Sequence, residues 1–596
     1  MKQKPFFGLI LLLFSTPIIL AQQNDSLHLY SRIKKIAAKR KFTKLIFSSI
    51  FSNPAISGEK KEITDNIIKH EGCIIRKIKI SVYDPYPSKD TIIQERGLRF
   101  FQRTINRFHF STKKWVIQNK LLFNAGKPLL ALEITESERA LRQTAYVNDA
   151  SIIVEPIIDS DSVDVLVEVN DKWAVTLPVE IKTTEKAYFA LRNKNLLGLG
   201  QYFEQTIDID LNGKNIFFSR YNIDNLRNSY ISTNIYYRND AGYSTAGLEF
   251  IRPSFSTLIK WSGGLLAEKN IGMKEFELNE TQKKYFPLEY TYYDTWVVRR
   301  FPIKNSNELI GNTGISLGSR VFARDFQLRP QDVNKINSDI YFKSGYLSVI
   351  NYYNQRFYKE KYIYRFGSFE DVPCGMILQF TNGIIKQEYQ QSKNYLSIFF
   401  RTASNFNFGY LSCSVLLATY YAKNFTNEVF FRNTIYFFSK LIALKTWSMR
   451  QFLHFDFSQD LNKNLSKKIL LRPSDLYSFP FDNYSVNAKS TLNFETVMYT
   501  PYQWIGFKFA PVLMLGSAVF QYQTEANSSR SKVFHALALG ILFRNENLIN
   551  STFQISVGYY PVQNEGKNQK FVIGSVASFT LRVNGFSVFK PEFVDY

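Results

Sequence analysis

The feature that most constrains this chain is the alternation of apolar and polar residues in short segments between Gln201 and Val583. In the clearest segment, from Thr552 to Tyr559, one face carries four large side chains: Phe553, Ile555, Val557 and Tyr559. Segments 229–239 and 577–583 repeat the pattern. Period-two alternation predicts strands whose two faces have different surroundings. Almost no segment of this region is suited to a buried helix, so we predict a mainly β chain.

Two mainly β architectures fit such a pattern, a transmembrane barrel and a large soluble sandwich or propeller. Aromatic residues make up 16% of the chain, with 36 Tyr and 53 Phe, which suits the aromatic girdles of a membrane barrel. A barrel strand spans lipid with only about 9 to 11 residues, half of them polar, so a slightly negative mean hydropathy is no objection. No repeat of fixed period supports a propeller. We therefore predict a transmembrane β-barrel.

The amino-terminal residues indicate the compartment. Lys2 and Lys4 precede a mostly apolar run that ends at Leu20 and is followed by Ala21, which is the pattern of a secretory signal peptide over residues 1–21. The rest of the chain has no apolar run of about 18 residues, so we predict no transmembrane helix. An exported barrel without a helical anchor is expected in a bacterial outer membrane, with outer-membrane lipid as its surroundings.

A basic segment follows, and it fills much of residues 22–71. The chain has a net charge of +23, and part of this excess lies in one run without acidic residues: Arg32, Lys34, Lys35, Lys39, Arg40, Lys41 and Lys44. Leu29, Ile33, Ile36 and Ala37 have helical spacing beside it, so the segment is either an amphipathic helix on anionic lipid or an acidic partner, or a solvated basic arm. Export argues against nucleic acid as the partner.

Neither cysteines nor histidines indicate a cofactor or metal site. The three cysteines, Cys73, Cys374 and Cys413, are widely separated and odd in number. The five histidines show no spacing typical of a metal site or of a catalytic partner. We expect no cofactor and no bound metal.

Residues 72–180 have the pattern of a small α/β unit. Residues 74–82 predict a strand, and the apolar spacing near Trp115 predicts a helix. A second helix is predicted over Thr135–Arg142, with Thr135 as its N-cap and two glutamates in its first turn. Residues 150–158 and 163–169 predict two strands joined by a polar turn.

This β-α-α-β-β order resembles a polypeptide-transport-associated (POTRA) domain, as found next to the barrel in the BamA/TamA superfamily. The similar segments are Leu121–Lys127, Glu136–Arg142, Val163–Val169 and Asp171–Trp173. The alternative is a generic α/β module. The length leaves room for a single such domain, followed by the barrel over residues 181–596.

The resemblance implies a barrel of 16 strands, and about 16 membrane-spanning strands with their turns fit between Gln201 and Val583. The raw count of strand-like segments is somewhat higher, and we assign the surplus to extracellular loops. The resemblance also implies five strands after a sixth extracellular loop. Five are predicted to begin near Asn487, Phe507, Val533, Thr552 and Phe571.

Two turns near the start of the barrel are predicted from glycine. Gly198 and Gly200, within Asn195–Gly200, resemble the entry to the superfamily's first barrel strand, where glycine permits a kink and close backbone approach. Asn212-Gly213 predicts a tight hairpin between the first two strands.

The sixth loop is where the chain departs from the superfamily, which has an Arg-Gly-aromatic motif there. Counting back from Asn493-Phe494-Glu495, which resembles the superfamily's Asn-x-Glu motif, places Tyr477, Ser478 and Phe479 at that position. The alternative for Asn493 and Glu495 is two ordinary polar residues that face the lumen.

The superfamily's loop arginine pairs with an aspartate on a later strand, and here Gly516 falls near that position. Because one partner alone would leave a buried charge unpaired, the joint absence of both is physically consistent. We expect the loop to be held by packing of Tyr477 and Phe479. Arg472 is the alternative, as a displaced motif arginine.

One hydrolase pattern, Gly-x-Ser-x-Gly, occurs at Gly314–Gly318. Hydrolases need this serine on a strand-to-helix turn with a histidine base. Here Ser316 lies in an alternating segment with no helix after it, so we expect no enzyme.

The hypothesis that follows is an outer-membrane protein that helps insert or translocate client polypeptides, together with periplasmic or membrane assembly partners. Its domain would offer a strand edge to a client, and its barrel would open at the seam between first and last strands. One alternative is a two-partner-secretion transporter whose basic helix near Ile33 plugs the lumen. Another is a structural or adhesive barrel without transport.

Overall fold

The computed structural model describes residues 67–86, 106–183, 186–210, 215–279, 282–303, 312–330, 342–388, 392–421, 428–461, 469–471, 475–477, 485–504, 507–523, 529–548, 552–561, 571–574 and 590–594. The signal peptide and nearly all of the basic segment predicted above lie outside these residues. So do the Asn212-Gly213 turn, Ser478, Phe479, Arg472 and the segment 577–583. Within the described residues, no helix has the length and apolar character needed to cross a membrane.

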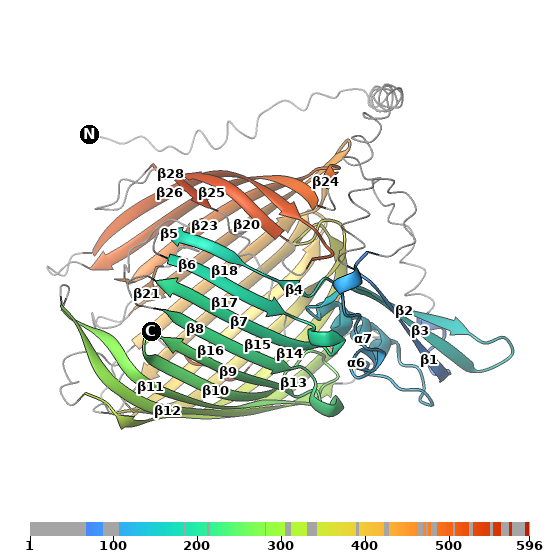
Figure 1. Cartoon of the computed structure of the whole chain (residues 1–596), viewed down its shortest axis with the longest axis horizontal. Coiled ribbons are helices and arrows are strands. Elements are labelled where there is room, and N and C mark those ends of the chain that lie inside the picture. The colour runs from blue at the N-terminus through green and yellow to red at the C-terminus, as the bar shows by residue number, and fades with distance from the viewer. Residues whose placement is uncertain are drawn as a thin grey trace.

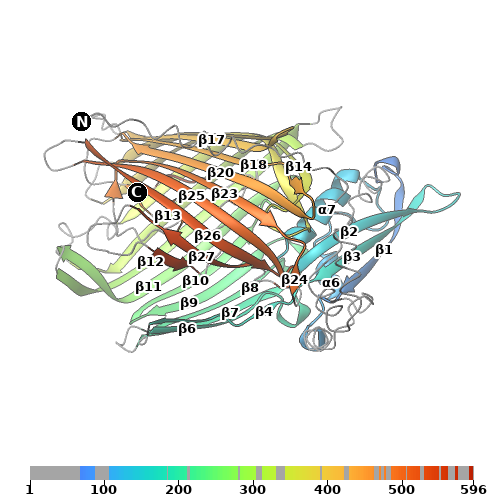
Figure 2. The same ribbon diagram turned by 90° about the horizontal axis from the view of Figure 1, so that it is seen from above.

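A small α/β domain lies at one end of a large β-barrel (Figures 1 and 2). Its elements are β1 (Ile74–Tyr83), α6 (Lys114–Gln118), α7 (Ala131–Gln143), β2 (Val147–Pro156) and β3 (Ser162–Asp171). The sheet has the order β1-β3-β2, with β1 parallel and β2 antiparallel to β3. The predicted β-α-α-β-β order is therefore present.

The domain has its own core, and the alternating sequence explains which faces form it. Ile152, Val165 and Val167 on the sheet are buried against Ile134 and Leu141 of α7. The predicted position of the second helix is wrong at its start, because α7 begins at Ala131 after an uncapped Leu130. Thr135 lies inside the helix, where its hydroxyl donates to the Ala131 carbonyl.

The rest of the chain forms the barrel, whose strands pair antiparallel in one sheet that closes on itself. Its strands are β4 (Val175–Thr176), β5 (Val179–Thr183), β6 (Lys186–Asn193), β7 (Gln201–Asp210), β8 (Ile216–Ile223), β9 (Ser232–Asp240), β10 (Tyr243–Arg252), β11 (Trp261–Asn279), β12 (Gln282–Ile303), β13 (Asn312–Leu328), β14 (Lys343–Lys361), β15 (Phe369–Gln387), β16 (Lys393–Phe406), β17 (Gly409–Tyr421), β18 (Glu428–Ser439), β19 (Ile442–Leu444), β20 (Trp447–Asp460), β23 (Ala488–Tyr499), β24 (Gln503–Trp504), β25 (Phe507–Gln523), β26 (Ser529–Arg544), β27 (Thr552–Tyr559) and β28 (Phe571–Gly574). A separate two-stranded sheet joins β21 (Ile469–Leu470) to β22 (Ser485–Val486). Two 3-10 turns, η1 (Leu196–Gly198) and η2 (Leu226–Asn228), lie at the rim.

The mainly β barrel is confirmed, but the count of 16 strands is wrong. Within the described residues the barrel sheet has 23 strands, and only β4, β19 and β24 are rim segments of two or three residues. The sheet starts at Val175, ahead of Gln201. Turns as short as Ala241-Gly242, between β9 and β10, also leave more of the chain for strands. The five strands predicted after the sixth loop are present as β23, β25, β26, β27 and β28.

The seam of the barrel joins the two ends of the sheet. In the closed strand order β28 lies beside β4 and β5, both of which pair with β6. The described part of β28 pairs with β27 only from Phe571 to Gly574, whereas β14 and β15 pair over their full lengths.

The two faces of the sheet differ as the alternation predicts. On β27, Phe553, Ile555 and Val557 are exposed on the outside, whereas Gln554 is 3% exposed and faces the interior. An outer surface of large apolar side chains is suited to lipid, where a closed sheet can pair its backbone groups internally.

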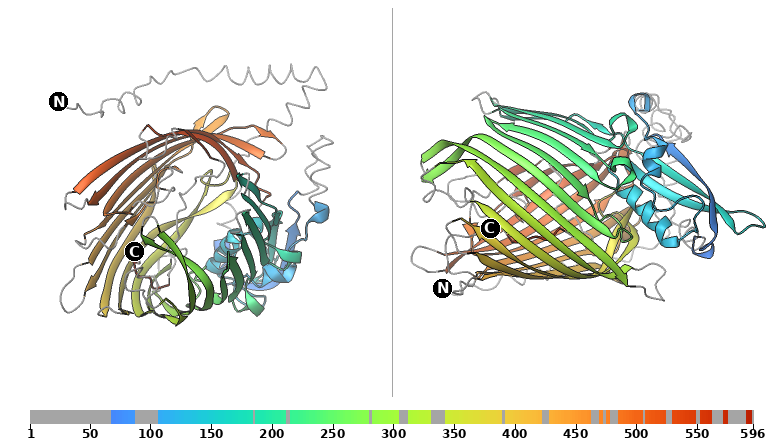
Figure 3. Two further views of the ribbon diagram at one scale, coloured as in Figure 1. Left: turned by 60° about the vertical axis from the view of Figure 1, so that its left-hand side comes forward. Right: turned by 90° about the horizontal axis from the view of Figure 1, so that it is seen from below.

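The strands of the barrel surround an interior (Figure 3), into which other parts of the chain place buried side chains. Leu471, Leu476 and Tyr477, from the connection between β20 and β23, are buried against the inner faces of the strands. Phe593 and Val594, near the end of the chain, pack on a separate inner cluster.

Candidate site at the mouth and in the lumen of the barrel

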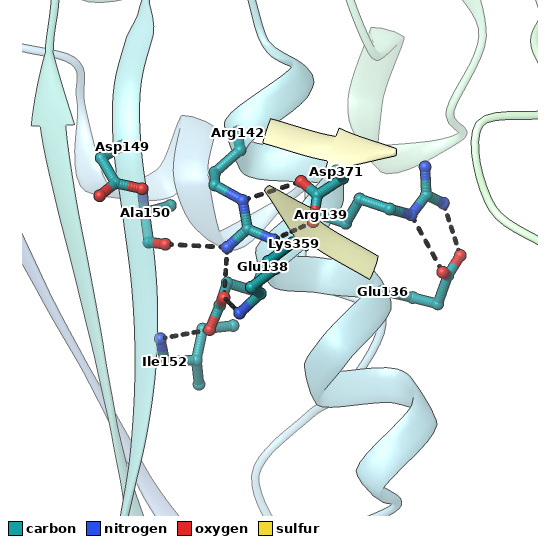
Figure 4. Close-up of polar contacts among 9 residues, drawn as sticks. All are labelled: Glu136, Glu138, Arg139, Arg142, Asp149, Ala150, Ile152, Lys359 and Asp371. Atoms are coloured by element: carbon teal, nitrogen blue, oxygen red, sulfur yellow. Dashed lines mark hydrogen bonds and ion pairs between the residues drawn. The ribbon is translucent and has the colours of Figure 1, made fainter. Parts of the chain in front are cut away.

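Helix α7 is fastened to the mouth of the barrel by buried charges (Figure 4). Arg142 donates from Nε and Nη2 to the two carboxylate oxygens of Asp371 on β15, at 2.9 and 2.7 Å. Arg142 also pairs with Glu138 one turn earlier on α7. Lys359 on β14 donates to Glu138 at 2.7 Å. The four side chains therefore alternate in charge across the boundary between domain and barrel.

Arg142 and Glu138 of α7 also form hydrogen bonds with the edge of strand β2. Arg142 donates to the Ala150 carbonyl at 3.2 Å, and Glu138 accepts from the Ile152 amide at 3.2 Å (Figure 4). The side chains that hold the domain on the barrel are thus also partners of the outer edge of its sheet.

A second buried pair on α7 holds the turn between β10 and β11. Arg139 forms a two-fold contact with Glu136, at 3.0 and 2.6 Å, and donates to the Phe255 carbonyl at 2.6 Å. Glu136 accepts from the Ser256 hydroxyl at 2.6 Å. The Arg139 guanidinium also lies 4.3 Å from the centre of the Phe357 ring, in cation–π geometry.

Further contacts come from other parts of the rim. Lys120 pairs with Asp224 in the β8–β9 turn at 2.5 Å, and Arg365 in the β14–β15 turn donates to the Asn148 carbonyl at 2.8 Å. The Trp173 amide donates to the Asn547 carbonyl in the β26–β27 turn at 2.8 Å. Since these turns are widely separated in the strand order, the domain lies across the mouth of the barrel.

The charges at this interface stabilise each other against the cost of burial. Burial alone would raise the pKa of Glu138, but the positive charges of Arg142 and Lys359 outweigh it and hold that pKa below its usual value. Burial opposes the charge of Arg142 too, and the carboxylates of Asp371 and Glu138 reverse this and raise the pKa of Arg142. Glu138 and Arg142 therefore stay charged at neutral pH.

Gly198 and Gly200 lie in the turn between β6 and β7, so three strand segments of the barrel precede them. Both have positive φ, 75° and 69°. A side chain at Gly198 would place Cβ 2.3 Å from the Ser111 carbonyl oxygen, and the Lys113 amide donates to the Gly198 carbonyl at 2.9 Å. The predicted place of these glycines, at the entry to the first barrel strand, is therefore wrong, because β4, β5 and β6 come before them. Their close backbone approach is made to the α/β domain.

The same turn is tied to the domain through Asp171. Asp171 accepts from the Thr112 amide and hydroxyl at 2.7 and 2.8 Å, and Asn195 donates to that hydroxyl at 2.8 Å. His109 Nε2 lies 3.1 Å from the Asp171 carboxylate. His109 thus contacts a carboxylate that is distant in the sequence, which the spacing of the histidines did not indicate.

In the lumen, the structure brings together Tyr477, Asn493 and Gly516. Asn493 and Gly516 are opposite each other on β23 and β25. A Cβ at Gly516 would lie 2.5 Å from Leu476 Cδ1, 2.9 Å from Asn493 Oδ1 and 3.0 Å from Tyr477 Cδ2. The absence of a side chain at Gly516 thus makes the space in which the loop sits.

Hydrogen bonds add to this packing. The Tyr477 hydroxyl donates to the Phe494 carbonyl at 3.0 Å, and Tyr560 donates to the Tyr477 carbonyl at 2.6 Å. Asn493 donates to the Asp475 carbonyl at 3.2 Å. Glu495 is buried on the same inner face.

The serine of the Gly-x-Ser-x-Gly pattern and the possible metal ligands are placed as follows. Ser316 lies fully buried within β13, where its hydroxyl accepts from Asn351 at 3.0 Å. The described residues contain no group of three or more His, Cys, Asp or Glu side chains arranged to hold a metal ion.

Sequence reasoning missed the role of the α7 charges, and it assigned Glu136 and Glu138 only to the first turn of a helix. Because α7 starts earlier, Glu136, Glu138, Arg139 and Arg142 lie along its middle and end, and each is at most 6% exposed. The available signal was their spacing, since Glu and Arg three or four residues apart are neighbours on a helix. An ion pair in the lumen, between Asp294 and Arg320, was also missed. The Arg320 guanidinium donates two hydrogen bonds to the Asp294 carboxylate, at 3.0 and 2.9 Å.

The comparisons with known proteins give structural similarities only. No model of a known protein family matches the sequence. No curated protein matches it. Among solved structures, BamA from Haemophilus ducreyi lacking POTRA domains 1–3 aligns over 96% of both chains, with 10% identity and a TM-score of 0.32. CdiB from Acinetobacter baumannii aligns over 94% of this chain and 87% of its own, with 10% identity and a TM-score of 0.34. CdiB from Escherichia coli aligns over 91% of this chain and 100% of its own, with 9% identity and a TM-score of 0.34. These low values do not identify a family for this chain.

The first prediction concerns the charges at the mouth. Arg142→Gln leaves Glu138 and Asp371 without their shared partner, and unpairing a buried charge typically costs about 3–5 kcal/mol. We expect the α/β domain to detach from the barrel at lower urea concentration, measured by limited proteolysis of the domain. Arg76→Gln is the control, because Arg76 pairs with Asp164 on the exposed face of the domain. Equal sensitivity of the two variants would contradict the proposed fastening.

The second prediction concerns pH. Burial, together with the positive charges of Arg365, Arg544 and Lys194 and against the attraction of Glu546, lowers the pKa of Lys172 to about 7 from its ordinary 10.5. Between these values the folded protein binds fewer protons than the unfolded chain, so stability rises as the pH increases through this window. Lys172→Met should flatten the pH dependence of the unfolding temperature between pH 7 and 10, whereas Lys79→Met, at an exposed lysine, should leave it unchanged. If the unfolding temperature of Lys172→Met varied with pH as that of the wild type does, this lysine would not be the cause of the pH dependence.

The third prediction concerns the loop. Gly516→Val places a branched side chain against Leu476 and Tyr477, and overpacking of this kind typically costs about 1–3 kcal/mol. We expect faster protease cleavage between β20 and β23 in the inserted barrel. Ser517→Val is the matched control, because neighbouring residues of a strand point to opposite faces. Unchanged cleavage in Gly516→Val would mean that this contact does not hold the loop.

Proposed function

We propose that this chain is an outer-membrane barrel of the BamA/TamA superfamily, with residues 72–180 as its POTRA-like periplasmic domain. Its proposed function is to help insert or translocate other polypeptides. The observation that carries this proposal is a β-α-α-β-β domain held by buried ion pairs across the mouth of a closed, apolar-faced barrel. Such a domain stands where a polypeptide from the periplasm would first reach the barrel.

The sheet of the domain offers an edge for an incoming strand. Its order, β1-β3-β2, leaves β1 and β2 as edges within the described residues. The edge of β2 is occupied at Ala150 and Ile152 by the side chains of α7. Residues 126 and 127 bond to β1 only at Ile75. We therefore propose β1, from Lys77 to Tyr83, as the edge to which a client strand adds by β-augmentation.

The seam supplies the second step of the proposal. An unpaired strand edge is costly in lipid, and a client strand satisfies it by pairing. In the closed strand order the ends of the sheet meet where β28 stands next to β4, so we place the opening of the barrel between these two strands. The client would then pass from the domain to this edge.

One observation favours a second candidate, a two-partner-secretion transporter. The lumen contains the loop with Tyr477 and the segment with Phe593, and a pore that conducts a secreted polypeptide needs such contents to stay sealed at rest. A structural or adhesive barrel without transport is the third candidate.

A comparison of the outer-membrane and secreted proteins of a deletion strain with those of its complemented parent tests the proposal. Loss of several unrelated barrels is expected for an assembly role. Loss of one secreted protein would instead indicate dedicated transport, and an unchanged set of proteins would contradict both. Complementation with Arg142→Gln separates the contribution of the docked domain from that of the barrel.

A further inference from the structure

The lumen contains a second set of contacts, far in sequence from the sixth loop, that surrounds the segment Lys590–Val594. Lys590 pairs with Asp294 on β12, whose side chain is 1% exposed. Arg320 on β13 pairs with the same carboxylate and donates from Nη1 to the Pro591 carbonyl at 3.0 Å. Tyr420 at the end of β17 donates to the Val594 carbonyl at 2.5 Å. The barrel thus contacts the segment through the Lys590 side chain and through two of its main-chain carbonyls.

An aromatic contact lies between these polar ones. The Phe593 ring stacks on Phe322 of β13, with ring centres 5.1 Å apart and planes inclined by 14°. Its edge meets Tyr395 of β16, with ring centres 6.4 Å apart at 76°. Lys343 Nζ lies 4.8 Å from the centre of the same ring. Stacked and edge-to-face rings, with a cation over the face, are favourable aromatic geometries.

The receptor side of these contacts is itself well built. Asp294 and Arg320 hold each other in a two-fold contact, and the Tyr292 hydroxyl donates to Asp294 at 3.1 Å. Phe322 and Tyr395 belong to one buried cluster with Leu347 and Tyr420. The strands β12, β13, β16 and β17 therefore form a fixed surface, and the segment contributes one lysine, one phenylalanine and two carbonyls.

We propose that this inner surface is a binding site for an extended peptide that carries a cation three residues before an aromatic residue. In the structure the chain's own Lys590–Val594 fills the site in this manner. Contacts to the Pro591 and Val594 carbonyls are available to any peptide. Asp294 selects the lysine, and the rings of Phe322 and Tyr395 select the aromatic residue. A client polypeptide with this pattern can take the place of the segment.

The last step, exchange with a client, rests on the proposed function, but the site itself does not. The segment belongs to the same chain and so competes as an intramolecular ligand, for which effective concentrations of roughly millimolar are typical. A free peptide should therefore bind only weakly while the segment is in place.

Binding of a fluorescent peptide with the sequence of residues 590–596 tests the site. The probe is added to the purified barrel in detergent, and binding is followed by fluorescence anisotropy. We expect binding to a variant that lacks residues 590–596 and much weaker binding to the full chain. No binding to the deletion variant would overturn the proposal, provided that its heat-modifiable migration in gels shows a folded barrel. Equal binding to both forms would also overturn it.

Substitutions then test the recognition. In the peptide, Phe593→Ala should weaken binding to the deletion variant by roughly tenfold, the value of a stacked aromatic contact. Glu592→Gln is the control, since Glu592 is exposed and its carboxylate takes no part in the contacts above. In the barrel, Asp294→Asn should weaken binding of the lysine peptide but not of its Lys590→Gln form. Uniform binding across these variants would exclude this mode of recognition. An unchanged proteome in the strain that lacks the whole gene would contradict the proposed function but would leave these binding results in place. The proposed function and the proposed peptide site can therefore fail separately.

Discussion

The structure depends on one constraint, that a sheet surrounded by lipid must pair every backbone amide and carbonyl within itself. Closure meets this constraint, and alternation along each strand then sends large apolar side chains outward and polar ones inward. A barrel with this many strands encloses a wide interior. Three parts of the chain lie on or in that interior: the α/β domain across the mouth, the loop with Tyr477 and the segment with Phe593. They partly cover or fill the space that closure of the sheet creates.

Many of the contacts between domain and barrel are ion pairs. Buried ion pairs contribute little net stability, because desolvation opposes their attraction, but their geometry is specific. Arg142 faces Asp371 through two parallel hydrogen bonds, and Glu138 faces Lys359. A domain held in this way has one defined position on the rim.

Much of the fold could be predicted from the sequence because strands and the helices of the domain have local signatures. The alternation in Thr552–Tyr559 and the starts of the last strands needed no knowledge of distant residues. The strand count failed because it depends on turn lengths and on where the sheet begins, and Val175 lies in a stretch assigned to the domain. Comparison with a superfamily motif assigned Tyr477 and Gly516 to partner positions, and in the structure a Cβ at Gly516 would lie 3.0 Å from Tyr477 Cδ2. Asp294 and Arg320 were not recognised, since a charged residue on an inner face looks like any lumen-facing residue until its partner strand is known.

The sequence distance across the mouth has a consequence for the order of folding. Arg142 and Asp371 are 229 residues apart, so their contact must await the formation of β14 and β15. Contacts of such separation close late, because the entropy of a long loop is lost before the contact forms. Until then Arg142 has Glu138 one helical turn away as a local partner. The domain can thus fold early without an unpaired charge, and its docking then reports that half of the barrel wall is already in place.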